Sequence, residues 1–202
     1  MTISDKWILA SESPRRREIL AGIGLDFKVH PSLDPEPVQE PGETPSAYAV
    51  RAATEKAAKV SEKYPSGLVI GADTIVVIGD HILGKPASSD DARLMLRRLA
   101  GHWHEVITGI CIHGGSQHRL RSDFCLSRVH FQRMTPQEIE WYVSTGEYHD
   151  KAGAYGIQGY ASIFIDRIQG CFFNVVGFPV STFYRLCMQM DINILSNGVG
   201  PR

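Results

Sequence analysis

The sequence lacks the features that mark secreted, disulfide-stabilised and membrane-spanning proteins. Its 202 residues include only four cysteines, and no two of them form a C-x-x-C pair, which argues against a disulfide framework and a structural zinc knuckle. No run approaches the roughly 18 apolar residues that a membrane span needs. The first residues also lack the apolar core of a signal peptide. We therefore expect a soluble, cytoplasmic protein.

An excess of either charge is also missing. The chain has 21 Lys and Arg residues against 22 Asp and Glu residues, so its net charge is −1 with neutral histidines. Such a balance provides no long-range field for nucleic acid or an anionic membrane, and aromatic and basic residues are not interleaved. We expect neither partner, so an anionic ligand would have to be bound by local charges.

Short β-branched runs alternate with capped amphipathic segments, and there is no internal repeat. This pattern is typical of one α/β domain, which we expect over residues 1–190, followed by a short tail at 191–202. The expected strands lie at 7–10, 27–30, 68–78, 81–84, 103–112, 117–132 and 162–168. Helices are expected to begin near Pro14, Pro45, Ser89, Pro136 and Phe178, and a turn is expected at 174–177.

Asp73 stands in an unusual place for a carboxylate. It lies within the run from Leu68 to Ile78, which predicts a strand buried on both faces. An isolated ionised carboxylate is strongly destabilising there, so Asp73 needs a cation. The Gly79-Asp80 pair predicts a tight hairpin turn, and a hairpin of this length can bring Lys85 back towards Asp73.

The same segment fits a phosphate-binding pattern. Gly79, Gly84 and Lys85 match G-x-x-x-x-G-K, but Pro86 stands where a P-loop has the Ser or Thr that holds magnesium. Proline also removes a backbone donor, and the turn explains Gly79 better. We therefore reject a P-loop.

The first expected helix has a strong start signal and a misplaced charge. Ser13 is a natural N-cap and Pro14 suits the first helical position. The arginines at 15–17 then lie at the positive end of the helix dipole, which disfavours cations. An anion shared by the helix N-terminus and the arginines would remove the conflict, as in phosphate sites. The alternative is a solvated basic face.

Three further features have a functional and a simpler interpretation. The glycine-rich segment 150–159 allows close approach to a ligand, with Lys151 and Gln158 projecting into it, or it is a flexible surface loop. Lys56, taken alone, is more typical of a solvated surface residue than of a catalytic one. His102, His104, Cys111 and His113 could suggest a metal cluster, but their spacing matches no standard zinc pattern.

Seven blocks occur together in an order that is hard to obtain by chance. They are S-x-SPRR at 11–16, RAATEKA at 51–57, GADT at 71–74, GKP at 84–86, H-x-V-x-TG at 104–109, DKAGAYGIQG at 150–159 and NVVGFP at 174–179. With these blocks the chain resembles the Maf-like nucleotide pyrophosphatases along nearly its whole length. The resemblance implies a mixed central sheet flanked by helices, similar to the inosine triphosphate pyrophosphatase-like (Maf/HAM1) fold, with an active-site cleft between two lobes.

The resemblance also implies an activity. It is the hydrolysis of a nucleoside triphosphate to the monophosphate and pyrophosphate with a divalent cation, Mg²⁺ or Mn²⁺. Gln158 in the late loop and Thr74 after the catalytic acid resemble the branch that acts on dTTP and UTP in a house-cleaning role, and base-modified pyrimidine nucleotides are further candidates. The family also implies a homodimer. The alternative function is a non-catalytic nucleotide-binding regulator of cell division or septum formation.

Residue roles carry over from the family onto the positions that match its motifs. Asp73 matches the proton acceptor, with Lys56 and Lys85 as charged catalytic partners. Glu36, Lys56 and Lys85 match the charged residues that line the metal and phosphate site of the family. We expect Glu36 and Asp73 to be the metal ligands, although the loop around Glu36 does not copy the family's usual acidic pair. Arg15, Thr74 and Gln158 match the specificity positions of the family. The substrate-binding set that we expect comprises Ser11, Arg15, Arg16, Thr74, Lys151 and Gln158. The sequence departs from the family pattern at Glu12, Ala53 and Tyr148.

Overall fold

The structure is a computed structural model that describes residues 7–33, 35–114 and 119–196. Parts of three expected features lie outside the described residues, namely Asp34 of the loop around Glu36, residues 117 and 118 at the start of the strand expected at 117–132, and residues 197–202 of the tail. The chain groups into two compact units, a first unit of 1–73, 108–125 and 177–202 and a second unit of 74–107 and 126–176. A single domain over 1–190 stays a prediction.

The strands form one mixed sheet, which confirms the predicted fold class. The sheet has seven strands in the order β2-β1-β3-β5-β6-β7, with β4 paired to β3. β1 runs parallel to β2 and β3, whereas the β3–β4 and β6–β7 pairs are antiparallel. The strands are β1 (Trp7–Leu9), β2 (Phe27–Val29), β3 (Leu68–Ile78), β4 (His81–Leu83), β5 (Trp103–Gly114), β6 (Arg119–Phe131) and β7 (Ile165–Gln169).

The helices begin where capping residues predict. Ser13, Thr44 and Ser88 each accept a hydrogen bond from a backbone N–H in the first turn. Thr135 and Glu138 form the complete capping box that the sequence indicates. The α-helices are α1 (Pro14–Gly22), α2 (Pro45–Ser61), α3 (Ser89–Leu99), α4 (Pro136–Ser144), α5 (Phe172–Val176) and α6 (Val180–Gln189).

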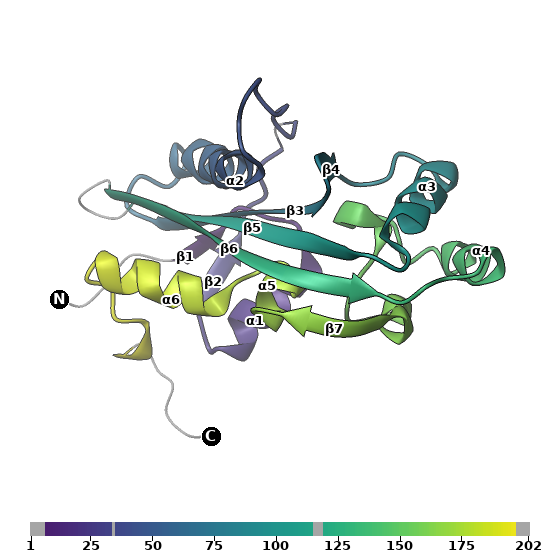
Figure 1. Cartoon of the computed structure of the whole chain (residues 1–202). Helices are drawn as coiled ribbons and strands as arrows, with labels where there is room; N and C mark the ends of the chain where they lie inside the picture. The colour runs from purple at the N-terminus through teal and green to yellow at the C-terminus, as the bar shows by residue number, and fades with distance from the viewer. Residues whose placement is uncertain (1–6, 34, 115–118, 197–202) are drawn as a thin grey trace. The chain divides into compact units, whose positions relative to one another are not determined.

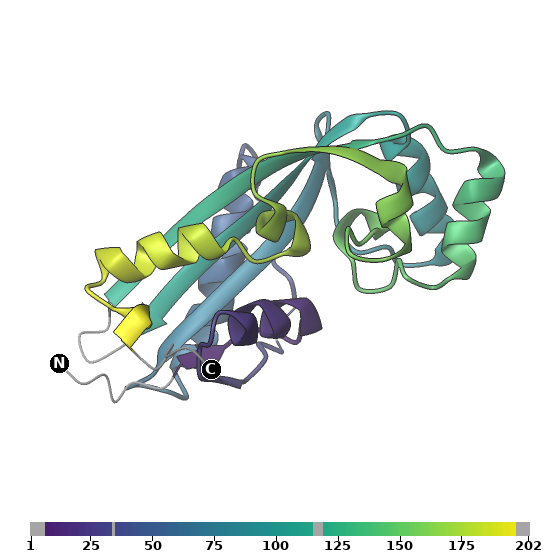
Figure 2. The same ribbon diagram turned by 90° about the horizontal axis from the view of Figure 1, so that it is seen from below.

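In the first unit, helices cover both faces of the sheet. Figures 1 and 2 show α2 on one face and α1 and α6 on the other. The Trp7 ring of β1 contacts the Phe183 ring of α6, with centroids 5.4 Å apart. The opposite face holds a core cluster under α2, made of Ile8, Ala10, Ala53, Ala57, Val60, Val69 and Cys111. The central strands are therefore buried on both sides, which is the environment predicted for β3.

The second unit has its own core, in which α3 packs against α4. Side chains from β3, β5 and β6 join these helices in one cluster. Its largest fully buried members include Tyr142, Phe131, Leu96 and Leu99. Because each unit has a separate apolar cluster, each has the means to hold its own part of the sheet rigid.

Two expected elements differ from the structure. The strand expected at 162–168 begins only at Ile165, because Tyr160–Phe164 forms a 3-10 segment. The turn expected at 174–177 overlaps the short helix α5, and Gly177 follows that helix with a φ of 116°. The tail expected from residue 191 includes a 3-10 turn at Ile194–Ser196.

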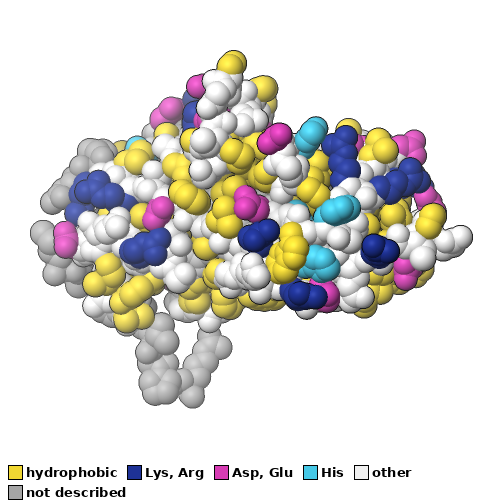
Figure 3. All heavy atoms as spheres, viewed as in Figure 1, with side chains coloured by type: hydrophobic (Ala, Val, Ile, Leu, Met, Phe, Trp, Pro, Cys, Tyr) yellow, Lys and Arg dark blue, Asp and Glu magenta, His cyan; other side chains and the backbone are white. Residues whose placement is uncertain are grey.

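The surface carries charges of both signs, and the cysteines are not paired in disulfides. On the face seen in Figure 3, basic and acidic side chains are interspersed among apolar ones. All four cysteines are free. Within the described residues, every helix is too short or too polar to cross a bilayer.

Candidate active site

Asp73 is a buried carboxylate held by a lysine. It lies in β3, where its residue surface is 6% exposed, so the prediction of an acid inside a buried strand is confirmed. The Lys56 Nζ atom of α2 lies 2.5 Å from Asp73 Oδ1. The predicted cation is therefore present. It is supplied by the preceding helix, α2, whereas the expected approach of Lys85 to Asp73 stays a prediction.

Two glycines allow α2 to approach the sheet closely enough for this ion pair. A Cβ atom on Gly71 would lie 2.0 Å from the carbonyl oxygen of Ala53, and one on Gly109 would lie 2.1 Å from that of Ala49. Only glycine leaves room for such backbone contact. Lys56 follows Ala53 by about one helical turn, so the close packing places its ammonium against the carboxylate of β3.

Glu36 is the second carboxylate near the Lys56 ammonium. Its Oε1 atom lies 3.7 Å from Lys56 Nζ, and its side chain is 46% exposed. Within the described residues, no three His, Cys, Asp or Glu side chains group as a metal site. Mg²⁺ commonly binds one or two carboxylates and completes its shell with waters and substrate phosphates. The two carboxylates therefore fit magnesium or manganese as the protein's share of such a site.

Arg16 connects three segments of the first unit. Its Nη1 atom donates to Ser11 Oγ and to the carbonyl oxygen of Ala72, both at 2.9 Å, and Nε donates to the carbonyl oxygen of Gly177 at 2.9 Å. Burial lowers the pKa of the guanidinium, and the nearby Asp73 carboxylate opposes that effect. The arginine thus has a structural role in fixing the part of β3 that carries Asp73.

The first unit brings together six of the predicted site residues. Ser11 is buried, and Arg15 is half-buried close enough to Arg16 for the two charges to interact. The set consists of Ser11, Arg15, Arg16, Glu36, Lys56 and Asp73. Its cationic side chains outnumber its carboxylates, which suits a highly charged anion.

The other predicted site residues belong to the second unit. Thr74 follows Asp73 directly in β3 and is half-buried, whereas Lys85 and Gln158 are exposed. Lys151 Nζ donates to the backbone carbonyl oxygen of Glu147 and, at 3.4 Å, to that of His149. These local bonds give Lys151 a role in shaping its loop. A common site for the residues of both units stays a prediction.

Asn174, the first residue of the last of the seven blocks, has a structural role that we did not predict from the sequence. Asn174 is fully buried, and its Nδ2 atom donates to the Val106 carbonyl oxygen at 2.9 Å and to Ser127 Oγ at 3.0 Å. It therefore ties α5 to β5 and β6. Its placement within an apolar stretch was the available signal, because a buried amide needs such partners.

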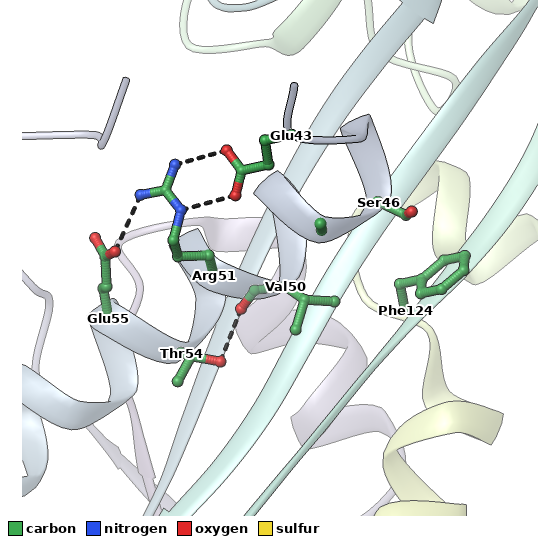
Figure 4. Close-up of a pocket in the computed structure, with 8 residues that line it drawn as sticks. Glu43, Ser46, Val50, Arg51, Thr54, Glu55 and Phe124 are labelled. Atoms are coloured by element: carbon green, nitrogen blue, oxygen red, sulfur yellow. Dashed lines mark hydrogen bonds and ion pairs between the residues drawn. The ribbon is translucent and has the colours of Figure 1, made fainter. Parts of the chain in front are cut away.

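Arg51 forms ion pairs with carboxylates of the first unit. Its Nη1 atom lies 3.1 Å from Glu55 Oε1, and Arg51 also forms a two-pronged pair with Glu43, with both contacts at 2.8 Å. Figure 4 shows these side chains at the edge of a pocket of about 570 Å³. The pocket is lined by Glu43, Ser46, Ala47, Val50, Arg51, Thr54, Glu55 and Phe124.

Comparison with known proteins gives one sequence family and more distant structural similarity. The sequence profile of the family described as Maf-like protein matches residues 6–190. A dTTP/UTP pyrophosphatase of Syntrophomonas wolfei subsp. wolfei is 47% identical over 189 residues, which cover 94% of this chain and 100% of that protein. A dTTP/UTP pyrophosphatase of Koribacter versatilis is 48% identical over 185 residues, covering 92% and 94%. The structure of the Staphylococcus aureus Ham1 protein aligns with a TM-score of 0.43 at 14% identity, covering 63% and 72%.

Proposed function

Because the chain belongs to the family of Maf-like proteins, we propose that it is a nucleotide pyrophosphatase that hydrolyses dTTP and UTP to the monophosphate and pyrophosphate. A base-modified pyrimidine triphosphate is a further candidate substrate. The relatives named dTTP/UTP pyrophosphatase support this reaction. Within the chain, the observation that carries it is the buried Asp73 carboxylate at 2.5 Å from Lys56, with Glu36 beside the same ammonium.

Asp73 and Lys56 have the properties that cleavage of a phosphoanhydride requires. Water must be deprotonated and brought to an electron-rich phosphorus, and negative charge then develops on the leaving pyrophosphate. In the proposal, Asp73 accepts the proton of the attacking water as a general base. The Lys56 ammonium stabilises the ionised carboxylate and, together with Lys85, the charge on the leaving group.

The arginines and α1 would hold the phosphates. Arg15 lies in the first turn of α1, where backbone N–H groups and the helix dipole favour an anion. Arg16 adds positive charge from a position fixed by Ser11 and by two carbonyl oxygens. Both residues therefore attract the triphosphate without requiring a long-range positive field.

Asp73 and Glu36 would hold the divalent cation. Their oxygen ligands suit Mg²⁺ or Mn²⁺, and phosphate oxygens of the substrate would complete the shell. When bound, the cation supplies Lewis-acid neutralisation of phosphate charge. The Lys56 ammonium, which lies between the two carboxylates, limits their mutual repulsion before a nucleotide enters.

Gln158 and Thr74 would select the base. A pyrimidine such as thymine or uracil presents a carbonyl acceptor and an N3–H donor, and a side-chain amide can satisfy both. Gln158 is exposed in the structure. A bound base would have to cover it, and the Thr74 hydroxyl would support the contact.

One assay separates the proposed enzyme from the alternative regulator. Pyrophosphate release is measured with Mg²⁺ and a panel of canonical and base-modified triphosphates, using Asp73→Asn as the matched control. We expect release to be fastest with dTTP or UTP and to be lost in the control. Nucleotide binding without pyrophosphate release would reject the enzyme and favour the non-catalytic regulator. We also expect a cytoplasmic homodimer, and light scattering would test the dimer.

A further inference from the structure

The loop that carries Glu36 is held by polar contacts rather than by apolar burial. Leu33 and Val38, which flank Glu36, are 84% and 85% exposed. Glu36 itself reaches Lys56 only across 3.7 Å, with a half-exposed side chain. An ion pair of this kind contributes little ordering by itself. The way in which the neighbouring backbone is fixed therefore also determines where the Glu36 carboxylate lies.

Tyr48 fixes the first of the two residues that follow Glu36. Its hydroxyl donates to the Pro37 carbonyl oxygen at 2.9 Å. Burial raises the pKa of the Tyr48 hydroxyl, and the nearby Asp73 and Glu36 carboxylates raise it further. The hydroxyl therefore remains protonated and available as a donor throughout the physiological pH range.

Arg51 fixes the second of these residues. Its Nη2 atom donates to the Val38 carbonyl oxygen at 2.9 Å, while the guanidinium holds Glu43 at the far end of the loop. Glu43 in turn accepts from the Glu40 N–H at 3.0 Å. The Arg51 guanidinium lowers the pKa of the Glu43 carboxyl to about 2, so the pair stays ionised at neutral pH.

Tyr48 and Arg51, which we call the tethers, belong to the same helix as the catalytic Lys56. Tyr48, Arg51 and Lys56 all project from α2, and the Arg51 guanidinium lies 5.6 Å from the centroid of the Tyr48 ring. We propose that Tyr48 and Arg51 are positioning residues that hold Glu36 beside Lys56 by fixing the carbonyl oxygens of Pro37 and Val38. This inference deepens the proposed function and rests on it, because Glu36 is there a ligand of the divalent cation.

The first test measures the loop without metal or nucleotide. Hydrogen exchange of the non-proline backbone amides at 35–43, among which those of Glu40 and Glu43 are hydrogen-bonded within the loop, is compared in the wild type, Tyr48→Phe and Arg51→Gln. We expect exchange to accelerate about 5-fold in Tyr48→Phe, as the loss of one hydrogen bond predicts, and by more in Arg51→Gln, which also loses the pair with Glu43. Arg93→Gln is the matched control, because Arg93 Nε donates to both carboxylate oxygens of Glu140, at 2.8 and 2.9 Å, in the second unit. Unchanged exchange at 35–43 in both tether variants would overturn the proposal.

The second test asks whether the tethers act through Glu36. Calorimetry measures the affinity of Mn²⁺ in the presence of a non-hydrolysable dTTP analogue. We expect Tyr48→Phe to weaken Mn²⁺ binding about 5-fold in the wild-type background and less than about 2-fold in a Glu36→Gln background. Equal losses in both backgrounds would assign Tyr48 a general structural role and overturn the inference. A wild-type protein that releases no pyrophosphate would refute the proposed function alone, since the exchange result stands without it.

Discussion

His104 Nε2 and the Tyr155 hydroxyl oxygen lie 2.7 Å apart inside the core of the second unit. The His104 side chain opens the H-x-V-x-TG block and is only 2% exposed. Burial lowers its pKa from 6.5 to about 4, and the charge of His130 adds to the effect. The imidazole is therefore neutral in the folded protein over a range in which it is protonated in the unfolded chain.

This difference predicts acid sensitivity. As pH falls from 6.5 towards 4, the unfolded state takes up a proton that the folded state does not, so the free energy of unfolding decreases. We expect His104 alone to contribute a loss of about 3 kcal/mol over this interval. Urea unfolding at several pH values, from 7 to 4, would measure it in the wild type and in His104→Gln, whose amide does not titrate.

Tyr155→Phe provides the control for the histidine. It removes the hydroxyl but leaves the buried imidazole, so it should lower stability while retaining the wild-type dependence on pH. His104→Gln should instead flatten that dependence. Parallel curves for the wild type and His104→Gln would show that other groups cause the acid sensitivity.

The ion pair between Lys56 and Asp73 predicts strong coupling. Lys56→Gln leaves a buried carboxylate without its cation, so we expect stability to fall by about 3 kcal/mol or more. Asp73→Asn should also destabilise the protein, but the double variant should be more stable than the sum of the single effects allows, by about 1 to 3 kcal/mol. Denaturant titrations of all four proteins would complete the cycle, and additive effects would contradict a direct pair.

Replacing Gly71 by alanine should disturb the packing of α2 on β3 and reduce activity. In Gly71→Ala, the new Cβ would meet the Ala53 carbonyl oxygen at 2.0 Å, and a backbone atom cannot rotate away. We expect a loss of about 2 kcal/mol or more in the free energy of unfolding, and a fall in pyrophosphate release as Lys56 shifts from Asp73. Gly22→Ala is the matched control, since its Cβ has no neighbour within 4 Å. Circular dichroism during urea unfolding would measure both, and equal stability of the two variants would contradict the expectation.

Local signals in the sequence predicted the elements well, because caps act over a few residues. Thr135 and Glu138 indicate the start of α4, and Ser13 with Pro14 indicates that of α1, as the structure confirms. The need of Asp73 for a cation was also predictable from its apolar neighbours. Which cation it would be was not, because the register of α2 on β3 depends on a backbone contact between Ala53 and Gly71.

Long-range contacts also explain the misplaced strand start. The Glu147 carboxylate accepts hydrogen bonds from the Tyr160 N–H at 2.6 Å and the Ala161 N–H at 3.3 Å. These bonds hold the first residues of the 3-10 segment that precedes β7. The alternation of residues near 162–168 predicts a strand. It gives no information about Glu147, which lies 13 residues before Tyr160.

The same carboxylate anchors the loop that carries Gln158, and this predicts how base preference changes. Gln158→Glu keeps an acceptor for the N3–H of a pyrimidine but loses the donor for its carbonyl oxygen. It gains an acceptor for the amino group of cytosine. We therefore expect kcat/KM for dTTP and UTP to fall about 10-fold relative to CTP. Steady-state kinetics with the three nucleotides would measure this ratio.

Glu147→Gln tests whether base preference depends on the order of the loop that carries Gln158, while Gln158 itself is unchanged. A neutral amide oxygen binds the Tyr160 and Ala161 N–H groups more weakly than a carboxylate does. We expect this variant to lose discrimination between nucleotides without gaining a preference for CTP, because Gln158 is retained in a looser loop. If Gln158→Glu left the ranking of dTTP, UTP and CTP unchanged, Gln158 would not be the residue that reads the base.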